Sequence, residues 1–140
     1  MDKLIIQSKV GEVEIDTATI IKFPKGILGF PGFDQYVILD PDENSPLKIL
    51  QSIDNPHLGF VVTDPLTFKP DYKLRLYQKD LDEIGVQEAN FDEVLFFVIV
   101  TIPENPSNMT ANLKGPLIVG KHSLMGKQVV IDSKEYELKY

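Results

Sequence analysis

The chain has 140 residues, 43% of them hydrophobic, which suffices for a single domain with an ordinary core over residues 1–140. The absence of cysteine excludes a disulfide framework, thiol catalysis and any metal site with Cys ligands. The formal net charge is -7, from 21 acidic and 14 basic residues with Arg75 as the one arginine, and this argues against direct nucleic-acid binding.

The N-terminal residues enter a strand-like pattern at Leu4 and lack the basic, apolar and small-residue regions of a signal peptide. The longest apolar run, Val94 to Val100, is far shorter than the roughly 20 residues that cross a bilayer. We therefore expect a cytoplasmic protein that does not enter a membrane.

Short apolar segments alternate with turn residues along the chain. They predict strands at Leu4 to Gln7, Glu12 to Ile15, Ile20 to Phe23, Tyr36 to Leu39, Lys48 to Ile53, Gly59 to Thr63, Lys73 to Leu76, Val94 to Ile102, Met109 to Leu113, Leu117 to Val119 and Lys127 to Ile131. Val10-Gly11 is placed to form a tight hairpin, and Leu124 to Gly126 a later one. This many short strands favours a mostly β protein, either a barrel or a sandwich.

One short helix is expected from Asp80 to Ile84, with Asp80 capping its first turn, Glu83 completing a capping box and Gly85 ending it. It begins an acidic region of fourteen residues without lysine or arginine, whose carboxylates are Asp80, Asp82, Glu83, Glu88, Asp92 and Glu93. This acidic patch is either a solvated helix and loop or an electronegative face that docks or repels a partner.

The usual catalytic constellations are missing. His57 and His122 are too far apart in the sequence to predict a metal site, and no Gly-rich phosphate loop occurs, so we expect neither a metal nor a cofactor. Asp64 and Asp71 flank one loop and could form a hydrolase-like carboxylate pair, or they could serve as turn and strand-start residues. A small-ligand-binding β-barrel or a carboxylate-dependent hydrolase therefore stays an alternative to a protein that only binds other proteins.

Several segments together carry a family pattern. They are Ile21 to Phe30, Leu50 to Asp54, Asp64-Pro65, Pro70 to Tyr72, Val100 to Pro103, Met109 to Leu113 and Gly115 to Leu117. In this order and spacing, over nearly the whole chain, they resemble the FliW family of flagellar assembly factors. The resemblance implies a compact, single-domain antiparallel β-barrel-like fold without enzymatic activity.

The resemblance also implies partners. Family members bind the C-terminal region of flagellin and, exclusively with it, the translational regulator CsrA, which they remove from flagellin mRNA without occupying its RNA surface. Carried over by position, the candidate partner-binding residues are Phe23, Gly29, Phe30, Gln51, Ser52, Thr110, Ala111, Asn112 and Leu113. The alternative at each position is structural: a core aromatic, a glycine with special backbone angles, or residues alternating across a strand.

Polarity and position single out some of these candidate partner-binding residues. Polar Gln51, Thr110 and Asn112 on strand-like segments are stronger candidates than their apolar neighbours, because each needs solvent, a partner or a buried network. Among the aromatic residues, Phe30 between Gly29 and Pro31 is the best candidate for an exposed anchor.

Overall fold

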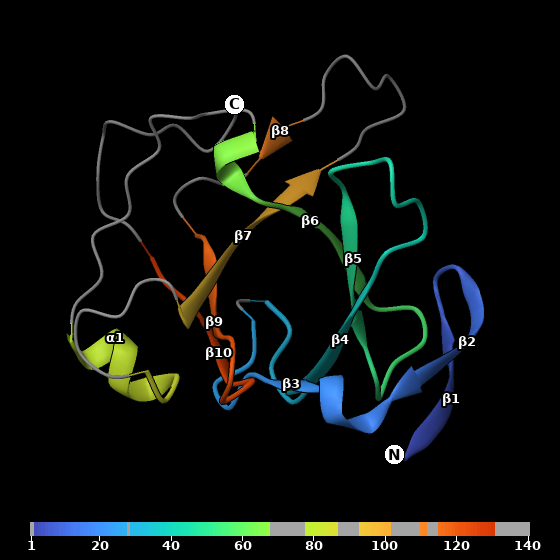
Figure 1. Cartoon of the computed structure of the whole chain (residues 1–140), viewed down its shortest axis with the longest axis horizontal. Coiled ribbons are helices and arrows are strands. Elements are labelled where there is room, and N and C mark those ends of the chain that lie inside the picture. Colours follow the sequence, from blue (N-terminus) through green and yellow to red (C-terminus); the bar gives the residue numbers. More distant parts are fainter. Residues whose placement is uncertain are drawn as a thin grey trace.

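A computed structural model describes residues 2–27, 29–67, 78–86, 93–101, 110–111 and 115–130, the pair 110–111 by its backbone (Figure 1). The strands are β1 (Lys3–Ser8), β2 (Gly11–Asp16), β3 (Ile21–Lys22), β4 (Gln35–Leu39), β5 (Lys48–Ser52), β6 (Gly59–Thr63), β7 (Val94–Thr101), β8 (Thr110–Ala111), β9 (Leu117–Gly120) and β10 (Gly126–Gln128). One α-helix, α1 (Gln78–Glu83), and two short 3-10 turns, η1 (Thr17–Thr19) and η2 (Pro65–Thr67), complete the described elements.

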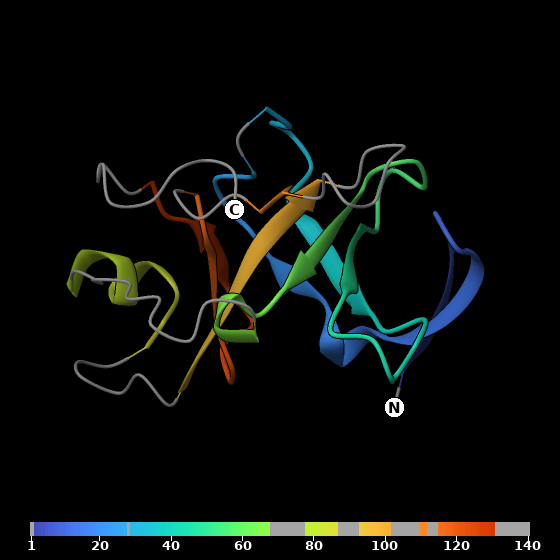
Figure 2. The same ribbon diagram turned by 90° about the horizontal axis from the view of Figure 1, so that it is seen from above.

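The main sheet is a nearly closed, barrel-like antiparallel sheet. Its strands follow the order β10-β9-β7-β6-β5-β4-β3, and β8 pairs with the end of β7. The two ends of this path meet, because the Lys22 N–H donates to the carbonyl of Leu124 over 2.9 Å and Lys22 forms a bridge with Met125. Figures 1 and 2 show the sheet curling round, with α1 and the β1-β2 hairpin on opposite sides of it.

The barrel interior is filled by side chains. The central core cluster consists of Ile21, Phe23, Ile27, Tyr36, Leu50, Leu58, Val62, Leu117 and Val119. Phe23 and Tyr36 are completely buried and pack edge to face, with ring centroids 5.5 Å apart. The described side chains thus fill the barrel interior with an apolar core.

The β1-β2 hairpin forms a separate two-stranded sheet beside the barrel. Its turn is at Lys9 and Val10, and Gly11 begins β2 with a φ of 97°, which few other residues adopt. Ile6 and Ile15 on its inner face are buried against Val37 of β4. The apolar alternation along both strands thus attaches the hairpin to the barrel.

Helix α1 ends as the sequence predicts and begins differently. Gly85 has a φ of 71°, and the N–H groups of Gly85 and Val86 donate to the carbonyls of Asp82 (3.1 Å) and Leu81 (2.9 Å), which closes the C-terminus. The helix begins at Gln78, so the predicted capping role of Asp80 is wrong. Asp80 lies within the first turn, where its buried carboxylate contacts Lys127 instead.

The predicted mostly β fold with one short helix is confirmed. Ten predicted strands correspond to β1 through β10, with shifted ends, while the strand expected at Lys73 to Leu76 lies outside the described residues. The late turn is at Lys121 to Ser123, earlier than the predicted Leu124 to Gly126. No helix in the described part of the chain is long and apolar enough to cross a membrane.

Candidate partner-binding surfaces

The loop after β3 presents Phe30 at the surface. Gly26, Gly29 and Gly32 all have positive φ, between 68° and 90°, so they let the chain fold back on itself. The Phe30 N–H donates to the carbonyl of Ile27 over 2.9 Å, which closes the turn. The Phe30 side chain is 39% exposed and its ring packs edge to face on Phe60, with centroids 5.1 Å apart. It is therefore available to a partner while being held in one place.

Phe23 belongs to the same predicted set but lies in the barrel core. Its side chain is 0% exposed, and a Cβ atom added at Gly126 would lie 2.7 Å from its ring. It packs where β3 and β10 approach each other. Phe23 therefore supports the loop after β3 from the core and, being fully buried, presents no surface to a partner in this structure.

Gln51 and Ser52, the predicted middle pair, are also fully buried. The Gln51 amide donates to the carbonyls of Ser52 and Leu58, each over 3.1 Å, and its oxygen accepts from the Lys9 N–H over 3.1 Å. The Ser52 hydroxyl accepts from the N–H groups of the turn that follows. These side chains connect the tip of the β1-β2 hairpin to the β5-β6 turn. A buried hydrogen-bond network within the fold therefore accounts for the polar residues on this strand.

The structure describes only part of the last group of candidate partner-binding residues, Thr110 to Leu113. Thr110 and Ala111 form β8 and pair with Thr101 and Val100 of β7. Asn112 and Leu113 lie outside the described residues. Partner binding by this group stays a prediction from the sequence.

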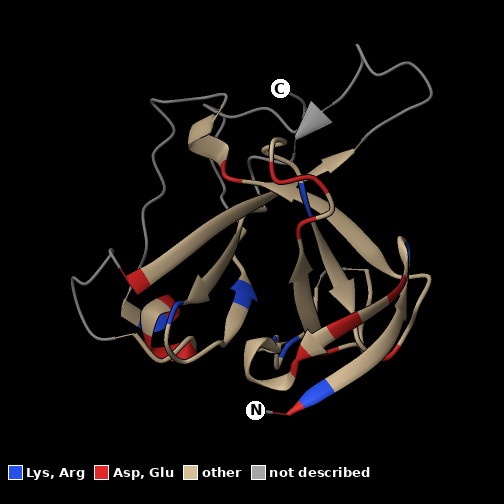
Figure 3. Cartoon of the chain, turned by 45° about the vertical axis from the view of Figure 1, so that its right-hand side comes forward, with Lys and Arg blue, Asp and Glu red and all other residues tan. Residues whose placement is uncertain are grey.

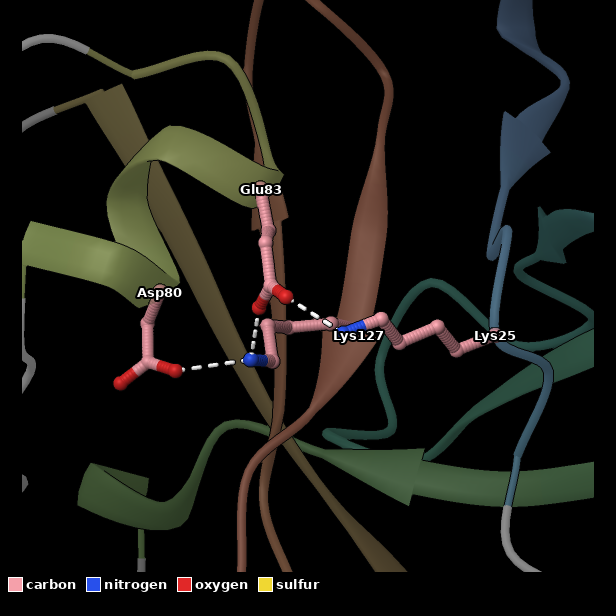
Figure 4. Close-up of polar contacts among 4 residues, drawn as sticks. All are labelled: Lys25, Asp80, Glu83 and Lys127. Atoms are coloured by element: carbon pink, nitrogen blue, oxygen red, sulfur yellow. Dashed lines mark hydrogen bonds and ion pairs between the residues drawn. The ribbon is translucent and has the colours of Figure 1, made fainter.

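The acidic patch proves to be partly neutralised in three dimensions. Glu83 Oε1 lies 2.5 Å from Lys25 Nζ, and its other oxygen pairs with Lys127 Nζ (Figure 4). Lys127 Nζ lies 2.8 Å from Asp80 Oδ1. We call these four residues the ion-pair network; it joins α1 to β10 and to the loop after β3. The two lysines come from segments 44 to 58 residues away, so local sequence could not reveal them.

The remaining residues of the acidic patch differ in their surroundings. Asp82 is exposed and accepts a hydrogen bond from the Gln78 side chain over 2.8 Å, and Glu93 is half-buried. Glu88 and Asp92 lie outside the described residues. Ion pairs therefore offset part of the negative charge at Asp80 and Glu83, and a partner-binding role for the acidic patch stays a prediction. Figure 3 shows acidic residues also on β2, a second concentration that the sequence analysis did not single out.

Hydrogen bonds from Lys127 and Lys25 lower the pKa of Glu83 from 4.5 to about 2. Burial opposes the charged form of Lys127, but its hydrogen bonds to Asp80 and Glu83 outweigh this and raise its pKa. The pKa shifts of Glu83 and Lys127 both favour the charged form of the side chain.

Replacing Glu83 with glutamine should remove a stabilisation that depends on pH. A carboxylate with a lowered folded-state pKa contributes stability above its unfolded value of 4.5, and this contribution is lost as the pH falls through about 2. The thermal midpoint of the wild type should therefore exceed that of Glu83→Gln at pH 7, and the gap should close towards pH 2. A gap that does not change with pH would contradict the role of the network.

A groove of about 370 Å³ lies between the loop after β3 and strand β10. It is lined by Lys25, Gly26, Ile27, Gly29, Pro31, Lys127, Gln128 and Val130. Gly29 and Pro31 flank Phe30 in the sequence, but Phe30 itself does not line the groove, since its ring packs on Phe60. Val130, which lines the groove, is 69% exposed. The loop after β3 thus carries both the exposed Phe30 ring and several of the residues that line the groove.

The described residues contain no group of three His, Cys, Asp or Glu side chains that could hold a metal ion. Asp64 accepts a hydrogen bond from the Leu66 N–H over 2.9 Å, as expected of a residue that opens a turn. Asp71, its proposed catalytic partner, lies outside the described residues.

Comparison with known proteins identifies the family. A family model described as FliW protein matches residues 4–140. The chain belongs to the FliW family. A flagellar assembly factor FliW of Alkaliphilus metalliredigens is 37% identical over 139 residues, covering 98% of this chain and 85% of the relative. That of Caldanaerobacter subterraneus is 40% identical over 131 residues, covering 93% and 86%.

A solved structure agrees with this assignment. A crystal structure of the flagellar assembly factor FliW superposes with a TM-score of 0.87 at 32% identity, covering 99% of this chain and 95% of that chain. Assembly factors of this family are not enzymes, which removes the hydrolase alternative. The barrel-like fold and the FliW family membership predicted from the sequence motifs are both confirmed.

Proposed function

We propose that this FliW-family chain is a cytoplasmic partner switch that binds the C-terminal region of flagellin and, exclusively with it, CsrA. Flagellin that is still inside the cell occupies the chain. Once flagellin is exported, the freed chain binds CsrA and relieves the repression of flagellin mRNA translation. The chain would act stoichiometrically, by binding alone.

The observation that carries the proposal is the exposed Phe30 ring within the motif from Ile21 to Phe30. The ring is partly exposed and held on Phe60, and its sequence neighbours Gly29 and Pro31 line the groove beside β10. An exposed aromatic ring held in one orientation is a feature expected at the centre of a protein–protein interface. We assign this surface to flagellin.

Net charge supports the part of the proposal that concerns CsrA. A regulator that holds mRNA must present cations to the phosphates, and this chain has a formal net charge of -7. Such a body bound beside the RNA path would attract the regulator and raise the electrostatic cost of RNA approach. Added salt should weaken this effect, since it screens exposed charges.

A calorimetric titration tests the switch. The chain is titrated with CsrA alone and again after saturation with the C-terminal segment of flagellin. Micromolar or tighter binding that flagellin abolishes is the expected result. Simultaneous binding of both partners would contradict exclusivity, and no heat with either partner would refute the proposed function.

Replacing Phe30 with aspartate tests the flagellin surface. The added carboxylate replaces an apolar contact, so we expect the dissociation constant for the flagellin segment to rise about tenfold or more. Leu66→Asp is the matched control, since Leu66 is 51% exposed and lies on η2, away from the loop. Equal loss of affinity in both variants, or none in Phe30→Asp, would remove flagellin from this surface.

A further inference from the structure

The outer edge of β1 is not covered by another strand among the residues that the structure describes. The Thr17 N–H donates to the carbonyl of Asp2, which fixes the hydrogen-bonded pairs of the hairpin. In the register that follows, these pairs are Leu4 with Ile15 and Ile6 with Val13. Because backbone groups alternate along a strand, those of Lys3, Ile5 and Gln7 point away from β2. Within the described residues, β1 pairs with no other strand.

Lys3 is the one charged side chain on β1, and the strand beyond it lacks the charges that usually protect an edge. Ile5 is 59% exposed and Leu4 is 38% exposed, so apolar side chains lie on both faces of this edge strand. The other strand of the hairpin has Glu12 and Glu14 exposed at its outward-bonding positions, and edge charges of this kind discourage pairing. An added strand would therefore find both backbone partners and apolar contacts at β1 and not at β2.

The charge around Ile5 indicates what kind of strand could bind at this edge. Glu14 lies directly opposite Ile5 in the register, and Glu12 lies opposite Gln7 on the same outer face. Neither glutamate has an ion-pair partner in the described part of the chain. Lys3 faces Asp16 and offsets one carboxylate, so the face keeps a net negative charge. A second copy of this chain is disfavoured, because two bodies of formal charge -7 repel each other.

We propose that the β1 edge is the docking site for an extended strand of a basic partner, with an apolar residue opposite Ile5 and cationic residues on either side. This inference rests on the proposed function in one respect, that the basic partner is CsrA. Main-chain hydrogen bonds to Ile5 and Gln7 provide the affinity, and the carboxylates of β2 select a positively charged strand. The site lies on the hairpin, apart from the Phe30 surface assigned to flagellin, so the proposed exclusivity requires the two sites to be coupled through the fold.

Two variants at one position test the edge. Ile5→Lys places a positive charge where a cationic strand must bind, and Ile5→Pro removes an outward N–H that the fold itself does not use. We expect each to raise the dissociation constant for CsrA about tenfold or more. Leu66→Lys is the matched control, with 51% exposure against 59% for Ile5, and it should bind CsrA as the wild type does. The thermal midpoints of all the variants establish that the fold is kept.

Amide hydrogen exchange of the wild type with and without CsrA reports on the backbone directly. Strand addition should slow exchange at Lys3, Ile5 and Gln7 selectively, because Leu4 and Ile6 are already bonded to β2. The edge assignment would be overturned if both Ile5 variants bound CsrA as tightly as the wild type does, or if binding did not slow exchange at these three amides. Either result would leave the proposed function standing. No binding of CsrA to the wild type would overturn the proposed function together with the partner named here.

Discussion

Replacing Phe23 with alanine should lower the free energy of unfolding by about 3 to 5 kcal/mol, as expected for a large aromatic side chain lost from a packed core. The side chain is 0% exposed and contacts Tyr36 edge to face. It also lies against Gly126, where β10 approaches β3. The variant would leave a cavity at the position where the two ends of the sheet path meet. Urea denaturation followed by circular dichroism measures the loss.

Phe30→Ala is the control for this prediction. Phe30 belongs to the same motif but is 39% exposed, so its loss should cost only about 1 kcal/mol. It should reduce flagellin binding while the fold is kept, whereas Phe23→Ala should reduce binding only through unfolding. Equal destabilisation by the two changes would show that the motif does not divide into a core residue and a surface residue.

Replacing Gln51 with glutamate should cost about 3 kcal/mol or more at pH 7, because the change buries a charge among carbonyl oxygens. The side chain is 0% exposed and its amide donates to the carbonyls of Ser52 and Leu58. A carboxylate in that place has nothing to donate. We expect the β1-β2 hairpin to detach first, since the Lys9 N–H is bound to the Gln51 side chain.

The pH dependence of this variant has a definite sign. Burial raises the folded-state pKa of the new carboxyl above its unfolded value of about 4.3. The variant is therefore closest to the wild type below that pH and loses stability as the pH rises between the two pKa values. Gln51→Met serves as the uncharged control, with a smaller loss that does not vary with pH. A loss for Gln51→Glu that is equally independent of pH would mean that the new carboxyl is reached by solvent.

Local patterns predicted the fold well where each residue's role depends on its neighbours in sequence. Apolar alternation located the described strands, because a strand that is half buried must place alternate side chains on the core. Gly85 marked the end of α1, since the positive φ required there suits glycine best. The predicted start of the helix was wrong, because Asp80 pairs with Lys127 in the folded chain and does not cap the helix.

The candidate site was predicted in part. The motif from Ile21 to Phe30 does contain the exposed Phe30, but it also contains Phe23, which the core requires. Polarity made Gln51 a strong candidate for partner binding, and the structure buries it in a hydrogen-bond network. A polar residue on a strand can satisfy its hydrogen bonds with a partner or within the fold, and the sequence alone cannot distinguish the two.

The sequence by itself determined the class of fold, the family, the lack of thiol chemistry and the negative net charge, because each follows from composition or from short-range pattern. Only the tertiary structure decided which aromatic ring reaches the surface and which carboxylates are neutralised. Lys25 and Lys127 reach Glu83 from segments 58 and 44 residues away. Burial and Coulomb interactions depend on distance in space, and folding brings together charges that the order of residues keeps apart.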